Sequence, residues 1–451
     1  HKKFAMIIRF FIKNFLSFDE ETHLSLYPGK GTDRRHTVHN GVRDDLPALK
    51  TAVVYGANAS GKSNLVKAIA FIQKFVTVGF PAQHGISYEP FKLSDKEAGP
   101  SKIEIEFKTQ NENFAYGIDF TKEEVKAEWL IKINKRSEQT IYERKNLKDK
   151  VAVQFDKVQF GSKENEQFAR FVGRGTPRNG LFLQEAYKRN INFIDEINVV
   201  YGWFAGKLNI ITPKSRATGL AFNLKKDKNL STTFTHFLNY FQTGIQNLAS
   251  QTLSPNTDLE DVPDKIIEDI THNLKPGKRA ILGAENNRKN YALEKNKDGK
   301  LTAYKLTAEH ETTSGQKIPF ELDEESDGTN RLIDLIPSLI DMTSGDAVYV
   351  IDELDRSMHP ILTRKLLEYF LASSEKQASQ LIVTTHESNL LDLNLLRRDE
   401  IWFIEKNQKN HSRLYSLLSF KPRKETNIAK GYLLGRYGAI PFLSNPKDLN
   451  W

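Results

Sequence analysis

The chain has 451 residues, of which 39% are hydrophobic and 27% charged, a balance typical of a globular protein and not of a disordered or collagen-like one. It contains no cysteine, which excludes disulfides, cysteine-ligated zinc sites, iron–sulfur clusters and a cysteine nucleophile. The net charge of +8 is small for this length, so it permits contact with nucleic acid without indicating it.

The first third of the chain is predicted to be rich in strands. Residues 1–5 precede Met6 and are expected to be the remnant of a tag or linker, with Met6 as the native start and no signal peptide after it. The apolar run 52–55 predicts a buried strand, and the residues after it predict a helix. The apolar face of this helix would consist of Leu65, Ala68, Ile69 and Ile72. Residues 102–160 alternate between apolar and polar side chains, which predicts an antiparallel meander.

The remainder of the chain changes from helices to an alternating pattern. Residues 163–275 are predicted to be mostly helical, and a hairpin is expected around Asp298 and Gly299. From residue 326 on, helices and strands alternate, which is typical of an α/β fold with a largely parallel sheet. These elements are a helix to about 343, a strand at 347–351, a helix at 361–372, a strand at 380–384 and strands near 401 and 415. No apolar run reaches the ~18 residues that span a bilayer, so we expect no membrane contact. The absence of cysteine fits a reducing compartment and we expect a cytoplasmic location, although a cysteine-free secreted protein would have the same composition.

A glycine-rich segment between the first predicted strand and helix fits G-x-x-x-x-G-K-[ST] at every fixed position. Its residues are Gly56, Ala57, Asn58, Ala59, Ser60, Gly61, Lys62 and Ser63, followed by Asn64. The glycines let backbone N–H groups close around phosphate oxygens at a helix N-terminus. Lys62 would place its charge on the β- and γ-phosphates, and the Ser63 hydroxyl would bind Mg²⁺. The segment therefore predicts a nucleotide site with Mg²⁺.

The apolar strand at 348–351 ends in two carboxylates, Asp352 and Glu353. Large apolar residues in a row are typical of a central parallel strand, and ligands bind beyond the C-terminal ends of such strands. Asp352 can reach the Mg²⁺ shell, and Glu353 can orient and deprotonate an attacking water. Taken alone, such a pair is more often a solvated helix start, but the phosphate loop earlier in the chain favours the catalytic interpretation.

A histidine, His386, ends the second apolar strand at 380–385. Beside a γ-phosphate, this imidazole can donate a hydrogen bond and sense hydrolysis. Taken alone, a histidine in this position is more often a satisfied strand-end residue, and we keep that interpretation for His359.

The order of these elements resembles the ABC-type ATPase head of the structural-maintenance, RecF-like and related families. The segment Ser326-Asp327-Gly328-Thr329 is similar to a degenerate signature motif, and the resemblance implies that Ser326 and Gly328 touch the γ-phosphate of an opposing protomer. A serine-capped helix start is the simpler alternative. The resemblance also places Asp355 at the D-loop of the family and Asn14 near the nucleotide. The glutamine loop has no firm counterpart, although Gln83 is a candidate.

Five further motifs carry a closer resemblance. They are 55–64, Pro90-Phe91-Lys92-Leu93, 352–360, Thr384-Thr385-His386 and 435–441. Together they resemble the prokaryotic AAA-type, OLD-like ATP-binding proteins of phage defence, in particular the RloA- and AbiL-like ATPases. This resemblance implies an ATPase that works with a separately encoded effector, often a nuclease. It also implies a homodimer or larger homo-oligomer, with a phage protein or a nucleic acid as trigger.

The predicted fold is α/β. It is an ABC-ATPase head with a central, mostly parallel sheet, an antiparallel β-meander lobe and an inserted helical lobe. Residues 6–160 would form the N-terminal part of the head, with the phosphate loop and the meander. Residues 161–278 would form a helical insertion for partner docking or oligomerisation. Residues 279–451 would carry the signature segment, the acidic strand end and the histidine.

Three alternatives remain open. A RecF- or SMC-like DNA-repair or DNA-clamp ATPase would bind DNA directly through the basic clusters at 144–150 and 288–300, but acids and turn residues interrupt both clusters and favour solvated loops. The degenerate signature argues against a transporter subunit, and intact Lys62 and Glu353 argue against a non-catalytic scaffold. A nuclease site is not expected on this chain, since only about 65 residues follow His386 and a typical domain needs more.

Overall fold

The computed structural model describes residues 4–30, 37–39, 46–94, 99–134, 136–148, 150–255, 257–259, 262–283, 291–374, 377–423 and 426–440. Residues 1–3 of the expected linker, Asp149 and 288–290 of the basic clusters, and Pro441 of the last motif lie outside these ranges. The chain divides into two compact units. The first contains the described residues within 1–212, 342–355 and 367–451, and the second contains those within 213–341 and 356–366.

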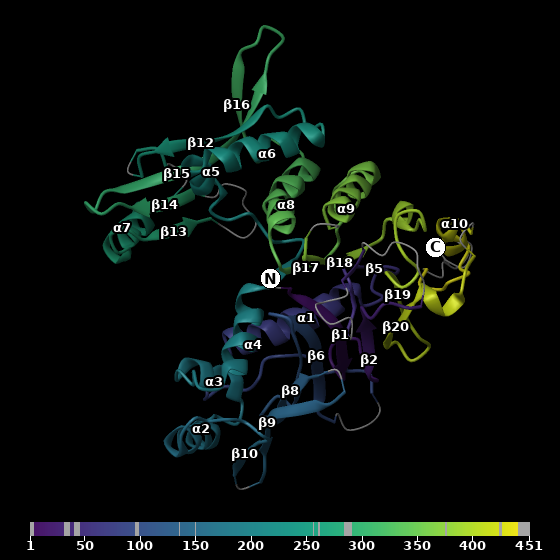
Figure 1. Ribbon diagram of the computed structural model, residues 1–451. Helices are drawn as coiled ribbons and strands as arrows, with labels where there is room; N and C mark the ends of the chain where they lie inside the picture. Colours follow the sequence, from purple (N-terminus) through teal and green to yellow (C-terminus); the bar gives the residue numbers. More distant parts are fainter. Residues whose placement is uncertain are drawn as a thin grey trace, which may run out of the picture. The chain divides into compact units, whose positions relative to one another are not determined.

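A seven-stranded antiparallel sheet belongs to the first unit (Figure 1). Its strands, in sheet order, are β10 (Val151–Phe155), β9 (Glu138–Asn146), β8 (Val125–Ile133), β7 (Glu112–Phe120), β6 (Ser101–Thr109), β1 (Met6–Lys13) and β2 (Thr22–Ser25). In β6, Ile103, Ile105 and Phe107 alternate with polar residues, so their side chains share one face and are fully buried. The predicted meander between 102 and 160 is confirmed, because each of the strands β6 to β10 pairs with the next.

The second sheet of this unit has six strands and carries the predicted nucleotide site. Its strands, in sheet order, are β11 (Leu208–Ile211), β17 (Val348–Ile351), β18 (Gln380–Thr385), β5 (Thr51–Tyr55), β19 (Ile401–Lys406) and β20 (Ser412–Ser416). All neighbours pair in parallel except β19 and β20, so the predicted α/β architecture with a mostly parallel sheet is confirmed. Because β18 lies between β5 and β17, the C-terminal ends of all three strands meet at one edge.

Helices cover these sheets and complete the core. They are α1 (Lys62–Thr77), α2 (Lys163–Gly175), α3 (Phe182–Lys188), α4 (Asp195–Gly206) and α10 (Ile428–Leu433), with α9 (Pro360–Ser374) crossing the unit boundary. The expected apolar face of α1, including Leu65 and Ile72, is buried. Gln73 of α1 donates to the backbone oxygens of Phe204 and Leu208, which ties α1 to the connection from α4 to β11. A short antiparallel pair, β3 (Val38–His39) and β4 (Ala48–Leu49), lies near the start of the chain.

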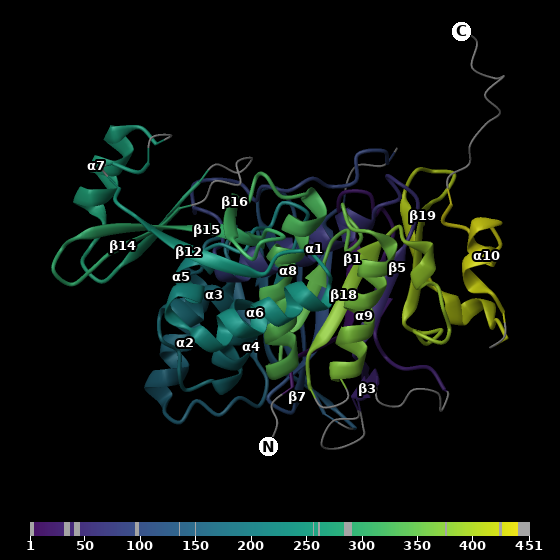
Figure 2. The ribbon, with the colours of Figure 1, turned by 90° about the horizontal axis from the view of Figure 1, so that it is seen from above.

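The second unit has its own antiparallel sheet and core. Its elements are α5 (Leu220–Lys226), α6 (Lys228–Tyr240), β12 (Asn247–Leu253), α7 (Asp264–Asn273), β13 (Arg279–Leu282), β14 (Tyr291–Lys295), β15 (Leu301–Glu311), β16 (Lys317–Glu321) and most of α8 (Asp327–Ser344). The hairpin predicted around Gly299 joins β14 to β15, with Gly299 at φ 84°. Ile267 of α7 packs against Tyr291 and Leu293 of β14, and Figure 2 shows α7 beside this strand.

Residues 161–278, expected as a helical insertion, contain α2 to α7 together with two strands, β11 and β12. The first of these strands pairs with β17 inside the parallel sheet. The boundary between the compact units follows β11, at residue 212. Within the described ranges, no helix combines the length and the apolar character that crossing a bilayer requires.

Candidate functional site

The phosphate loop leaves β5 at Tyr55 and enters α1 at Lys62. Gly61 has φ 114°, a conformation that residues with a Cβ atom rarely adopt. A Cβ atom on Gly56 would collide with the backbone oxygen of Ile404 in β19. The two fixed glycines of the motif are therefore required by the backbone path and by the close approach of β19.

The Lys62 side chain is buried under its own loop. Its ammonium group donates to the backbone oxygens of Gly56 at 2.7 Å and Ala57 at 2.9 Å, and its Nζ atom lies 3.4 Å from Nδ1 of His386. Burial lowers the pKa of Lys62 to about 8, although the carboxylates of Asp355, Glu353 and Asp352 act in the opposite direction. An incoming anion would therefore favour the charged form of this lysine.

A hydroxyl inside the loop has no protein partner. Ser60 is 4% exposed, and its Oγ atom forms no hydrogen bond. The loop is held from outside by β20, because the Ser412 hydroxyl donates to the backbone oxygen of Ser60 at 2.6 Å and its Oγ atom lies 2.8 Å from the hydroxyl of Ser17. Asn64 also donates to Ser17, at 2.9 Å. A rigid loop with an unpaired buried hydroxyl fits an anion such as a phosphate.

The two predicted carboxylates follow β17. Asp352 is 5% exposed, and its Oδ1 atom accepts a 2.6 Å hydrogen bond from the hydroxyl of Thr384. The same hydroxyl accepts the backbone N–H of Glu353 at 2.9 Å. Glu353 has φ 51°, a left-handed conformation that costs free energy in a residue with a side chain. Thr384 of β18 thus fixes both residues at the acidic strand end.

His386 and Asp355 connect the ends of β18 and β17. The backbone N–H of His386 lies within hydrogen-bond distance of both carboxylate oxygens of Asp355, at 3.2 and 3.3 Å. Desolvation lowers the pKa of His386, and the charge of Lys62 lowers it further. The imidazole is therefore neutral at pH 7, with one ring nitrogen able to donate and the other able to accept.

These elements enclose one polar cleft of about 550 Å³. Its lining residues are Asn58, Ala59, Ser60, Gly61, Lys62, Ser63, Asn64, Glu353, His386 and Lys406. Asp352 and Asp355 do not line the cleft. Asp352 instead accepts a hydrogen bond from Thr384, and Asp355 contacts the backbone N–H of His386. The sequence interpretation assigned no role to Ser412 or Lys406, and it named Thr384 only as part of the motif Thr384-Thr385-His386. Each of them is polar and lies on a strand beside β5 or on the next strand along the sheet. This position could identify them as site residues only once the strand order is known.

Two other predicted positions lie outside the lining of the cleft. Asn14 has φ 48°, accepts from the backbone N–H of Phe91 at 3.1 Å and donates to the backbone oxygen of Gly99 at 2.5 Å. It therefore holds the segment around Phe91 and does not line the cleft. Gln83 is exposed and is likewise absent from the lining.

The signature-like segment lies in the second unit. The Ser326 hydroxyl accepts from the backbone N–H of Thr329 at 3.1 Å, so Ser326 caps α8. A Cβ atom on Gly328 would come within 2.5 Å of the backbone oxygen of Ser357, so this position requires glycine. Ser326 itself is exposed.

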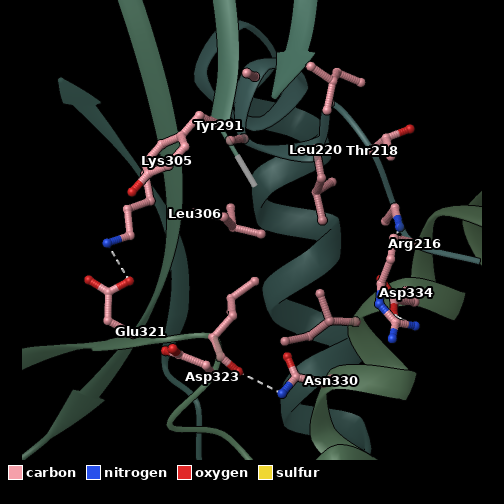
Figure 3. Close-up of a pocket in the computed structure, with 17 residues that line it drawn as sticks. Arg216, Thr218, Leu220, Tyr291, Lys305, Leu306, Glu321, Asp323, Asn330 and Asp334 are labelled. Carbon is pink, nitrogen blue, oxygen red and sulfur yellow. Dashed lines mark hydrogen bonds and ion pairs between the residues drawn. The ribbon is translucent and has the colours of Figure 1, made fainter. Parts of the chain in front are cut away.

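A small cavity of about 60 Å³ lies in the second unit (Figure 3). Charged groups around it pair with each other, as Lys305 does with Glu321 at 2.6 Å and Arg216 with Asp334 at 3.4 Å. Asn330 donates to the backbone oxygen of Leu322 at 2.6 Å. These polar groups at the wall of the cavity are therefore engaged with other protein groups.

The residues at the cleft fit Mg²⁺. Ser63, which lines the cleft, offers a hydroxyl, and Asp352, which is buried behind the lining residues, offers a carboxylate oxygen. Mg²⁺ prefers oxygen ligands, of which a protein often supplies only one or two. Among the described residues, no group of three or more histidines, aspartates or glutamates is arranged to hold a metal ion. A metal held jointly with nucleotide phosphates agrees with both observations.

Comparison of the sequence with models of known protein families gives one match. A family model described as "AAA domain, putative AbiEii toxin, Type IV TA system" matches residues 52–392, more than half of the chain. No curated protein sequence matches.

Solved structures of SMC head domains align with low similarity. A head domain with a coiled coil and joint from Pyrococcus yayanosii has 11% identity over 96% of this chain and 99% of that chain, with a TM-score of 0.42. An SmcHead bound to the C-winged helix domain of ScpA has 13% identity over 92% and 99%, with a TM-score of 0.39. The SMC head domain from Thermotoga maritima has 12% identity over 91% and 98%, with a TM-score of 0.35.

Proposed function

Because this chain belongs to the family of AAA domains whose model matches residues 52–392, we propose that it binds ATP in the polar cleft and hydrolyses it. One observation carries this proposal. The phosphate loop, Glu353 and His386 come from three neighbouring strands and line the same cleft within one compact unit. This arrangement provides a cation, a base and a hydrogen-bonding imidazole around the place where phosphates would lie.

Each residue has a distinct task in this proposal. Lys62 releases the backbone oxygens of Gly56 and Ala57 and donates to the β- and γ-phosphates instead. Ser63 and Asp352 would hold Mg²⁺, which neutralises phosphate charge when it is bound. The Ser60 hydroxyl, unpaired in the protein, donates to a phosphate oxygen.

Glu353 orients the attacking water and takes its proton. Its backbone is fixed by Thr384, so the carboxylate is positioned before the nucleotide arrives. His386 is neutral at pH 7 and can donate to the γ-phosphate, while its contact with Asp355 transmits the loss of that phosphate to the segment after β17.

We further propose that two copies of the chain close around ATP, with Ser326 and Gly328 of one copy facing the nucleotide of the other. ATP would control a separately encoded effector, such as a nuclease, in cytoplasmic antiviral defence. The family description, which names a toxin of a type IV TA system, supports a role in a system of two components. Identifying the protein that co-purifies with the native chain, and the product of the neighbouring gene, tests this assignment.

The catalytic proposal predicts different defects for two variants. Lys62→Ala should lose ATP binding, because a buried cation is removed from the phosphate site. Glu353→Gln should keep ATP binding and lose turnover by at least about 100-fold, since the general base is absent. Binding is measured by calorimetry and turnover by phosphate release.

The matched control is Lys67→Ala, which removes an exposed lysine from the same helix, α1, and should retain both properties. Unchanged turnover in both Lys62→Ala and Glu353→Gln would refute the assignment of the cleft as an ATPase site.

A further inference from the structure

A lysine outside the phosphate loop reaches the same cleft. Lys406 is the last residue of β19, which runs parallel to β5 with Phe403 opposite Tyr55. The C-terminal ends of parallel strands meet at one edge of the sheet, so β19 delivers Lys406 beside the phosphate loop. Accordingly, Lys406 is among the residues that line the cleft.

Lys406 also borders a second, adjoining cavity of about 300 Å³. This cavity has an apolar part formed by Leu16, Pro90, Phe91 and Leu93. Only Lys406 and Asn64 belong to the lining of both spaces among the described residues. A ligand with a charged chain in the cleft and an apolar body in the adjoining cavity would therefore pass this lysine.

The ammonium group of Lys406 has no partner among the described residues. No described residue forms an ion pair or hydrogen bond with its side chain, which is exposed. The Lys62 ammonium, by contrast, is buried on two backbone oxygens. An exposed, unpaired ammonium at the wall of an anion site can bind a phosphate oxygen without first breaking an internal contact.

The neighbouring residue, Glu405, is held by the C-terminal segment 432–440, which we call the clasp. The backbone N–H of Ala439 donates to Oε2 of Glu405 at 2.9 Å, and the Tyr415 hydroxyl donates to the backbone oxygen of Tyr437 at 2.8 Å. Gly438 has φ 69°, and a Cβ atom on it would lie 2.5 Å from the same Glu405 oxygen.

The clasp therefore fixes the end of β19. Tyr437 is 3% exposed and stacks on Phe403, so the segment is packed and not merely adjacent. Consecutive side chains of a strand point to opposite faces, so holding Glu405 against the clasp leaves Lys406 on the other face.

We propose that Lys406 is a second cation of the nucleotide site, which contacts the polyphosphate where it passes from the cleft to the adjoining cavity, and that the clasp positions it. This inference rests on the proposed ATPase function. It also gives a role to residues 435–440, the described part of the motif at 435–441, which the sequence alone left unassigned.

The test compares steady-state ATP hydrolysis of the full chain and its variants. Lys406→Gln should raise the KM for ATP by about tenfold, because one charge-assisted hydrogen bond is lost, and should change kcat by less than about twofold. Lys406→Arg should restore a KM near that of the wild type. The matched control, Lys409→Gln, removes an exposed lysine from the adjacent turn and should leave KM unchanged.

Two outcomes distinguish a failure of the proposed function from a failure of the role of Lys406. A wild-type chain that neither binds nor hydrolyses ATP would overturn the proposed function itself. A wild-type chain that hydrolyses ATP, together with an unchanged KM in Lys406→Gln, would overturn only the role of Lys406.

The clasp is tested with Gly438→Ala, which should raise KM in the wild-type background and add nothing in the Lys406→Gln background. Tyr415→Phe, which removes only the hydroxyl bound to Tyr437, provides a milder variant with the same expectation if Gly438→Ala folds poorly. Equal effects of either change in both backgrounds would show that the clasp does not act through Lys406.

Discussion

At the scale of single residues, Glu128 in β8 shows how a buried carboxylate outside the cleft depends on its hydrogen-bond partners. Its side chain is fully buried and accepts hydrogen bonds from the hydroxyls of Tyr116 at 3.1 Å and Tyr142 at 2.8 Å. It also accepts the backbone N–H groups of Phe182 at 2.6 Å and Leu183 at 3.0 Å, at the start of α3. The meander is thus joined to α3 by one carboxylate.

We predict that Glu128→Gln lowers the free energy of unfolding by about 3 kcal/mol. The amide keeps the shape of the side chain but loses acceptor capacity, and it leaves the buried Arg144, 3.6 Å away, without its counter-charge. Urea unfolding followed by circular dichroism measures the loss.

Glu143→Gln is the control for this change. It removes a partly exposed carboxylate from the neighbouring strand β9, where Glu143 pairs with Lys145 at 2.7 Å, and should cost less than about 1 kcal/mol. Equal losses in the two variants would contradict the role assigned to Glu128.

The lowered pKa of Lys62 predicts how ATP affinity depends on pH. In the free protein this pKa is about 8, and bound phosphates would raise it because they favour the ammonium form. ATP affinity should therefore be constant below about pH 7 and fall by up to about tenfold per pH unit above pH 8.

Calorimetry between pH 7 and 9.5 measures this dependence. Lys62→Arg provides the control, since a guanidinium stays charged over this range and should bind ATP with a flat profile, at whatever affinity remains. A flat profile in the wild type would contradict the assignment of the titrating group to Lys62.

Single residues were predictable from the sequence where the chemistry dictates the residue type at a fixed spacing. Lys62 follows Gly61 in the phosphate loop, and Glu353 follows an apolar strand, so the sequence placed both beside the same cleft. Thr384 and Lys406 have no such local pattern. Their importance depends on β18 lying between β5 and β17, and on β19 lying beside β5.

At the scale of elements, strands that pair with the next strand in the chain were predictable, whereas a strand that pairs with a distant one was not. The meander was predictable because β6 to β10 pair in chain order, and their alternation is visible in each strand. In contrast, β11 occupies only 208–211 within a mostly helical region and pairs with β17 at 348–351. In β11, Asn209 interrupts the apolar residues, so this short strand lacks the unbroken apolar run that made β17 recognisable without its partner.

Buried polar side chains join the elements across these distances. Gln380 at the start of β18 accepts the backbone N–H of Ile7 at 2.8 Å and donates to the backbone oxygens of Ile7 at 2.9 Å and Leu49 at 2.7 Å. One amide thus satisfies backbone groups of β1 and β4 and ties them to the parallel sheet. A glutamine before an apolar run gives no sign of this role, because its partners are far away in the sequence.

At the scale of the whole molecule, the predicted site residues divide between the two compact units. Lys62, Glu353 and His386 belong to the first unit, and Ser326 and Gly328 belong to the second. The resemblance to ABC-type heads implies that the second group completes the site of another copy. The cap formed by Ser326 is a simpler explanation of its hydroxyl, and an experiment must separate the two.

Asparagine and aspartate both cap helices as well as serine does, but only aspartate adds a negative charge. We therefore predict that Glu353→Gln forms an ATP-dependent dimer, that Ser326→Asn in this background retains the dimer, and that Ser326→Asp loses it. The reason is repulsion between the new carboxylate and the γ-phosphate of the opposing copy. Mass photometry with and without ATP measures the change as a doubling of mass. Loss of the dimer in both variants would point to the hydroxyl itself, and retention in both would exclude Ser326 from the interface with the nucleotide.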